Sequence, residues 1–125
     1  MSGRAVILIV EDNEANRLLA GAVLEREGYR VEMAENSAQA LDMLGRRAPD
    51  LILMDIQLPG LDGLTLTRQL KGDTKTAAIP VVALTALAMT GDRERTIEAG
   101  CSGYISKPIN TRTFAAEVRK FLRTA

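Results

Sequence analysis

The segment LILMD, residues 51–55, decides the fold, because four consecutive apolar residues lead directly into an aspartate. An unbroken apolar run of this length is typical of a strand that is covered on both faces. The runs AVILIV at Ala5–Val10 and VVAL at Val81–Leu84 have the same character. We therefore predict three central strands of one sheet, at Ala5–Val10, Leu51–Met54 and Val81–Leu84.

Two further strands are predicted at the edges of this sheet. Residues Arg30–Ala34 alternate in polarity, with apolar side chains at Val31 and Met33, and Gly103–Ser106 is a short mixed segment. Such patterns fit strands that have one less buried face, as edge strands do. The second and fifth strands of the chain are therefore expected at the two edges.

Helices are predicted after each strand, with residues at their ends that favour helix termini. The helix before Gly100 contains Gly91 and few apolar residues, so we expect it to be the weakest. The predicted helices cover Glu14–Glu27, Ser37 (as the cap) to about Gly45, about Gly63–Lys71, Met89–Ala99, and the segment capped by Thr111.

This alternation of strands and helices predicts an α/β fold with a doubly wound parallel sheet. Connections of this length require parallel strands with helices on both faces. With the first, third and fourth strands in the centre, the strand order is 2-1-3-4-5, the flavodoxin-like (βα)5 order. A chain of 125 residues fits one domain, which we expect to span residues 1–125. Many functions share this fold, so the site must identify the function.

Composition excludes several classes of function. The chain has 16 Lys plus Arg, 16 Asp plus Glu and no basic run interleaved with aromatic residues, so direct nucleic-acid binding is not expected. It has no histidine, which excludes Ser-His-Asp catalysis, histidine metal ligands and an internal phosphohistidine. With one cysteine, Cys101, no signal-peptide pattern and no apolar stretch near the ~20 residues that span a bilayer, we expect a cytoplasmic protein without membrane association.

Polar side chains follow four of the five predicted strands, at the point where each strand ends. Because the carboxyl ends of parallel strands meet at one edge of a sheet, these side chains are expected to converge at the crevice between the first and third strands. Carboxylates held together repel one another unless a cation lies among them, so we predict a cation site. The residues are Glu11, Asp12, Asp55, Thr85 and Lys107.

Mg²⁺ is the cation that this pattern favours, because it prefers oxygen ligands and commonly joins carboxylates to a phosphate. We expect Asp12 and Asp55 to be direct ligands and Glu11 to act through water. The backbone carbonyl of Gln57 is expected to supply a further oxygen. Once the metal offsets the negative charge, Asp55 can act as a nucleophile toward a phosphoryl group.

Two residues complete the chemistry of phosphoryl transfer. Lys107 offers positive charge to the phosphate oxygens, and the Thr85 hydroxyl can donate a hydrogen bond to the product. A cis peptide bond before Pro108 is predicted to aim the lysine. Taken singly, these residues have plainer explanations, such as a helix cap, a turn residue or a solvated lysine. Their joint placement at the strand ends is what favours a phosphoryl-transfer site.

At these positions the chain resembles the receiver domains of two-component response regulators, over essentially all 125 residues. The resemblance implies that Asp55 is phosphorylated in a Mg²⁺-dependent reaction and that Thr85 and Tyr104 form a conformational switch. It implies a sensor histidine kinase or a histidine phosphotransfer protein as the donor. The matching motifs are VEDN at 10–13, LMDIQLP at 53–59, DG at 62–63, LTA at 84–86 and SKP at 106–108.

Within that family, the segments at 51–64, 79–101 and 103–109 are most similar to stand-alone single-domain regulators of the DivK type. The alternative is a receiver that works within a hybrid histidine kinase, although an end three residues beyond Leu122 leads us to expect an independent unit. Two other classes are disfavoured. An FMN carrier would have its phosphate repelled by the acidic pair, and a phosphatase of the haloacid dehalogenase type would need an acid where Gln57 stands.

The remaining expectations concern partners and lifetime. The helix at 14–27 has a wider apolar band than packing on a sheet requires, so Ala15, Leu19 and Ala22 are expected to include exposed residues that meet the donor. The helix at 89–99, the strand at 103–106 and the last helix are expected to signal to a downstream protein. Leu87 and Gln57 should align water poorly, which predicts slow self-dephosphorylation and no turnover enzyme.

Overall fold

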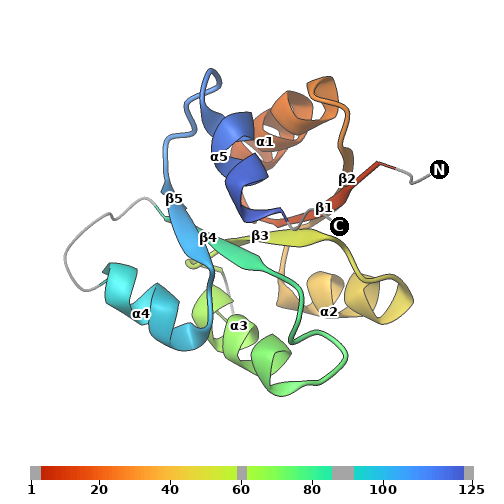
Figure 1. Cartoon of the computed structure of the whole chain (residues 1–125), viewed down its shortest axis with the longest axis vertical. Coiled ribbons are helices and arrows are strands. Elements are labelled where there is room, and N and C mark those ends of the chain that lie inside the picture. The colour runs from red at the N-terminus through yellow and green to blue at the C-terminus, as the bar shows by residue number, and fades with distance from the viewer. Residues whose placement is uncertain (1–3, 59–61, 86–91, 123–125) are drawn as a thin grey trace.

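Figure 1 shows the computed structural model, which describes residues 4–58, 62–85 and 92–122. All five predicted strands are present in one parallel sheet of order β2-β1-β3-β4-β5, which confirms the predicted flavodoxin-like order. The third and fourth strands are each one residue longer than predicted and include Asp55 and Thr85, while the first begins one residue later, at Val6. The strands are β1 (Val6–Val10), β2 (Arg30–Ala34), β3 (Leu51–Asp55), β4 (Val81–Thr85) and β5 (Gly103–Ser106).

Helices cover both faces of the sheet: α1 and α5 lie on one side of it in Figure 1, and α2, α3 and α4 lie on the other. The predicted fourth helix is confirmed over 92–99, whereas residues 89–91 lie outside the described residues. None of the described helices is long and apolar enough to cross a membrane. The helices are α1 (Glu14–Arg26), α2 (Ser37–Arg46), α3 (Gly63–Gly72), α4 (Asp92–Ala99) and α5 (Phe114–Phe121).

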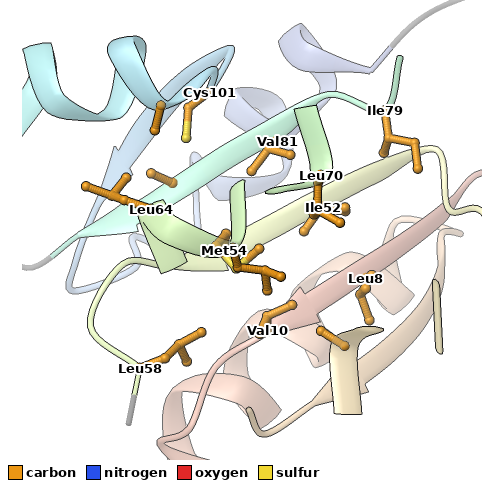
Figure 2. Packing of buried hydrophobic residues seen from close by; sticks show 14 of the residues in the cluster. Leu8, Val10, Ile52, Met54, Leu58, Leu64, Leu70, Ile79, Val81 and Cys101 are labelled. Carbon is orange, nitrogen blue, oxygen red and sulfur yellow. The ribbon is translucent and has the colours of Figure 1, made fainter. Parts of the chain in front are cut away.

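Each central strand contributes to two apolar cores, because successive side chains of a strand point to opposite faces. Ile7 and Ile9 of β1 belong to the core under α1 and α5, whereas Leu8 and Val10 belong to the core under α2, α3 and α4. Figure 2 shows the second of these cores, in which Met54 lies near its centre. All residues of β3 and β4 are buried, while β2 is mostly half-buried. This difference confirms the predicted central and edge positions.

The predicted cap of α2 is wrong by one residue. Ser37 is the first residue of the helix, and Asn36 is its N-cap. The Asn36 side chain accepts a hydrogen bond from the Gln39 N–H at 2.8 Å, while its own backbone is extended. Asparagine and serine are about equally good caps, so the pair Asn-Ser leaves the boundary open to local geometry.

The predicted start of α5 is also wrong. The helix begins at Phe114 and not directly after Thr111, because a turn occupies residues 111–113. The Asn110 side chain accepts a hydrogen bond from the Arg112 N–H at 2.9 Å and stabilises this turn. An asparagine that bonds to its own backbone two residues on favours a turn over a helix.

Gly63 brings α3 into close contact with the end of β3. It is the first residue of α3, and its N–H donates to the Ile56 carbonyl at 3.3 Å. A Cβ atom at this position would overlap the Asp55 carbonyl oxygen. A residue without a side chain is therefore required where the helix meets the strand that carries Asp55.

We expect Gly63→Ala to lower the free energy of unfolding by about 1–3 kcal/mol, because the added methyl group must push α3 away from β3. Urea denaturation measures this change. Gly45→Ala is the matched control, since a Cβ at Gly45 meets nothing within 4 Å, and it should raise stability by about 0.5–1 kcal/mol. Equal effects of the two substitutions would show that the close approach at Gly63 does not matter.

Candidate functional site

Three carboxylates converge at the carboxyl edge of the sheet. Glu11, Asp12 and Asp55 each have an oxygen within 4.8 Å of the other two. They meet because β1 and β3 are paired neighbours, with Val10 beside Met54 in the register. Glu11 and Asp55 are buried, and Asp12 is exposed. The structure thus brings together the acidic residues that the sequence analysis singled out.

Glu11 has a contact at each of its polar groups, although its buried Oε1 makes an ion pair and, among the described residues, no hydrogen bond. Its N–H donates to the Ala34 carbonyl at 3.0 Å, which continues the pairing of β1 with β2. Its carbonyl accepts from Arg17 Nη1 at 2.9 Å. Its Oε2 accepts from the Asn13 N–H at 3.2 Å, and its Oε1 lies 2.6 Å from Lys107 Nζ. The carboxylate therefore has a defined orientation within the cluster.

Lys107 joins two of the carboxylates in ion pairs. Its Nζ lies 2.6 Å from Glu11 Oε1 and 3.2 Å from Asp55 Oδ2, and its backbone N–H donates to the Thr85 carbonyl at 2.7 Å. Burial acts to lower the pKa of Lys107, but Glu11 and Asp55 outweigh burial, so the pKa lies above its ordinary value. The ammonium stays charged at neutral pH. The peptide bond between Lys107 and Pro108 is cis, as predicted.

The Asp55 carboxyl lies in an environment that disfavours its negative charge. Burial raises the pKa of Asp55, and the neighbouring Glu11 raises it further. The Gln57 N–H, which donates to Asp55 Oδ1 at 2.9 Å, and the Lys107 ammonium act in the opposite direction without cancelling the rise. The cluster thus holds more negative charge than its lysine offsets. Oxygen donors in this state could hold a hard divalent cation such as Mg²⁺.

Thr85 and Tyr104 lie on the same face of neighbouring strands. Tyr104 of β5 pairs in the register with Ala83, two residues before Thr85 in β4. Thr85 is buried at the end of its strand. Tyr104 is half-buried and packs against the core under α2, α3 and α4. The two side chains therefore face the same layer of helices, and their expected role as a switch remains a prediction.

The structure does not test the roles predicted for Gln57 and Leu87. Gln57 is exposed, and its backbone N–H donates to Asp55. This contact does not test whether the Gln57 carbonyl is a metal ligand. Leu87 lies outside the described residues. Their expected roles in binding metal and in limiting hydrolysis remain predictions.

Arg17 is a site residue that the sequence analysis missed. It is buried in α1, and its guanidinium contacts the backbone carbonyls of Glu11 and Asp12 at 2.9 and 3.4 Å. A signal was available in the helical spacing, because Arg17 shares a helix face with Ala20 and Leu24, which are fully buried. A cation on the buried face of an amphipathic helix indicates a specific polar partner.

Comparisons with known proteins agree with this geometry. The sequence model of one protein family, the response regulator receiver domain, matches residues 7–119 of this chain. The polar-differentiation response regulator DivK of Brucella anthropi is 46% identical over 119 residues, which are 95% of this chain and 97% of that protein. The chemotaxis protein CheY4 of Vibrio cholerae, at 23% identity, shares the fold with a TM-score of 0.91 over 96% of this chain and 100% of its own.

A third relative has a metal ion in its own structure. The receiver domain of a sensor histidine kinase from Pseudomonas aeruginosa is 37% identical and has a TM-score of 0.85, over 96% of this chain and 98% of that chain. Its structure contains a magnesium ion coordinated in the active-site cleft. The family match over residues 7–119, together with the identity to DivK, shows that this chain belongs to the response regulator receiver domain family.

Proposed function

We propose that this protein is a single-domain response regulator that accepts a phosphoryl group on Asp55 in a Mg²⁺-dependent reaction. The donor is a phosphohistidine of a sensor histidine kinase or a histidine phosphotransfer protein, since this chain has no histidine of its own. The observation that carries the proposal is the cluster of Glu11, Asp12 and Asp55 with Lys107 in contact with two of them. We propose that this phosphoryl transfer takes place in the cytoplasm, as the composition favours.

The carboxylate cluster fits the metal that this reaction uses. Asp12 and Asp55 would hold Mg²⁺ directly, Glu11 would hold it through water, and the Gln57 carbonyl would add an oxygen. Bound there, the cation supplies charge that offsets the carboxylates and the phosphoryl oxygens. The magnesium ion in the related kinase receiver supports this assignment.

The chain's own residues then carry out the transfer. An Asp55 oxygen forms a bond to phosphorus as the bond between phosphorus and the donor histidine breaks. Lys107, already 3.2 Å from Asp55 Oδ2, contacts the phosphoryl oxygens as they become attached to Asp55. The Thr85 hydroxyl donates a hydrogen bond to the product. The domain catalyses its own modification and is a signalling protein, not a turnover enzyme.

A stand-alone regulator is favoured over a receiver domain that works within a hybrid histidine kinase. DivK matches over 97% of its own length at 46% identity, whereas the kinase receiver from Pseudomonas aeruginosa is 37% identical. The DivK relatives are described as regulators of polar differentiation. We propose a regulator of this type that acts through contacts with other proteins.

The donor-binding surface in this proposal is an apolar stripe on α1, formed by Ala15, Leu18, Leu19 and Ala22. These residues are exposed, with Leu18 and Leu19 at 54% and 40%, and they recur at the spacing of one helix face. The helix begins beside the carboxylate cluster, since its N-cap, Asn13, follows Asp12 directly. A donor helix packed on the stripe would therefore lie near Asp55.

The output surface in this proposal consists of α4, β5 and α5. Thr85 moves toward the phosphoryl group, and Tyr104 moves into the space that Thr85 leaves, which shifts α4. A groove of about 480 Å³ between β5 and α5, lined by Tyr104, Pro108 and Phe121 among others, offers a downstream protein an apolar and polar surface. To shift the equilibrium to the active state, phosphorylation must favour that state by only a few kcal/mol, which new charged hydrogen bonds can supply.

The phosphorylated state is proposed to be long-lived. Hydrolysis requires a water aligned with the bond between Asp55 and phosphorus, and an exposed Gln57 without an acidic partner holds such a water poorly. Leu87 can only exclude water. Removal of the phosphoryl group is then left to the kinase or to reverse transfer onto histidine.

We predict that Asp55→Asn abolishes phosphorylation and stabilises the metal-free protein at neutral pH. The pKa of Asp55 is raised in the folded state, so its charged form lowers stability at pH values above that pKa. The amide removes this penalty, and its advantage should shrink as the pH falls and the native carboxyl becomes protonated. Phosphotransfer assays and thermal unfolding without Mg²⁺ at several pH values measure both effects. An Asn variant that still takes up phosphate would refute the proposed acceptor.

We predict that Leu19→Glu slows transfer from a phosphorylated donor by about 10-fold, because it places a charge in the centre of the α1 stripe. Phosphorylation by a small acyl phosphate, which needs no docking, should be unchanged. Leu41→Glu is the matched control, since Leu41 of α2 is 42% exposed but lies away from the stripe. If both variants accept phosphate from the donor at the same rate, the stripe is not the donor site.

We predict that Mg²⁺ with a phosphate mimic changes the amide NMR signals of residues 86–99 and of Tyr104. The change follows from Thr85 and Tyr104 facing the same core on neighbouring strands. Thr85→Ala should confine the changes to the surroundings of Asp55. The switch is refuted if the wild-type changes are already confined to the loop after Asp55.

A further inference from the structure

Arg17 is a buried cation in a position that does not favour one. The residue is 8% exposed and lies near the start of α1, where the N-terminal end of the helix dipole disfavours positive charge. A buried charge also lowers stability unless it is well paired. An apolar side chain of similar size would fill this place at lower cost, so the contacts of Arg17 must explain its presence.

The main contacts of Arg17 are backbone carbonyls of the acidic loop. Its Nη1 donates to the Glu11 carbonyl at 2.9 Å and to the Asp12 carbonyl at 3.4 Å. The carboxylate of Glu14 lies 4.0 Å from Nη2, but that side chain is 79% exposed, so the ion pair is weak. Arg17 therefore acts chiefly on the two peptide groups that carry the neighbouring acids of the cluster.

Helix geometry explains how Arg17 reaches this loop. The Arg17 N–H donates to the Asn13 carbonyl at 2.9 Å, which places Arg17 one turn into α1. Side chains of a helix lean toward its N-terminus, so a long side chain at this position extends back to the residues before the cap. The guanidinium thus meets residues 11 and 12 from beneath the helix, on the side away from solvent.

We propose that Arg17 is a positioning residue for the cation site. It fixes the carbonyls of Glu11 and Asp12, so that their carboxylates already face Asp55 before a metal binds. This inference rests on the proposed Mg²⁺-dependent function and adds a residue to it. Groups that orient metal ligands without touching the metal typically change affinity about 10–100-fold.

The test compares Mg²⁺ affinity with stability in three variants of the full chain. Arg17→Met keeps the volume and removes both hydrogen bonds, Arg17→Lys keeps one flexible donor, and Arg26→Met is the control, because Arg26 is exposed in the last turn of the same helix. Calorimetric titration with MgCl₂ gives the Kd, and thermal unfolding without Mg²⁺ gives the midpoint. Neither measurement requires a phosphate donor.

We expect Arg17→Met to bind Mg²⁺ about 10-fold more weakly with an unfolding midpoint close to that of the wild type, since the lost hydrogen bonds are offset by burial of an apolar group. Arg17→Lys should have an intermediate Kd, and Arg26→Met should match the wild type. A merely structural arginine would lower the midpoint and leave the Kd of the folded protein unchanged.

Wild-type affinity in Arg17→Met, or an equal loss in Arg26→Met, overturns the proposal. If Arg17→Met does not fold, Arg17→Lys decides, because weakened binding by a folded lysine variant supports the role and wild-type binding overturns it. Absence of Mg²⁺ binding by the wild type itself would overturn the proposed function, and the role of Arg17 with it.

Discussion

The ion pair between Lys107 and Glu11 is the interaction on which the site depends. It connects the residue after β5 with the residue after β1, across the carboxyl edge of the sheet, at 2.6 Å. Burial of either charge without the other would lower stability, because Glu11 is buried and Lys107 is largely so. The same ammonium contacts Asp55, so three strands of the sheet are coupled electrostatically where their carboxyl ends meet. Asp55 is thus held between this ammonium at Oδ2 and the Gln57 N–H at Oδ1.

The fold could be predicted because its strongest signals are long and redundant. Three unbroken apolar strands, one alternating strand and one short mixed strand indicate which strands are central, and parallel connections then allow few strand orders. The boundaries of α2 and α5 could not be predicted as well. They depend on which of several suitable polar residues bonds to a nearby N–H. Asn36 caps α2 in place of Ser37, and Asn110 stabilises a turn that delays the start of α5 beyond Thr111.

The placement of the site residues followed from the topology, since Glu11, Asp12 and Asp55 end paired strands. The orientation of each side chain did not follow from it. Side-chain packing determines which oxygen of Glu11 contacts Lys107, and it brings the Arg17 guanidinium to the Glu11 carbonyl. Spacing along the chain does not encode either contact. A polar residue on a buried helix face was the visible sign of such packing, and its chemistry had to be read from the structure.

The alternation of side chains in the strands has a consequence for how a signal could spread. Thr85 and Tyr104 face the layer of α2, α3 and α4, whereas the exposed α1 stripe belongs to the opposite layer. In the proposed function, a rearrangement that begins at Thr85 acts first on the layer of α2, α3 and α4, and the central strands separate that layer from the α1 stripe. The proposed donor surface on α1 and the proposed output helix α4 therefore lie on opposite faces of the sheet, and each can change over evolution without altering the other.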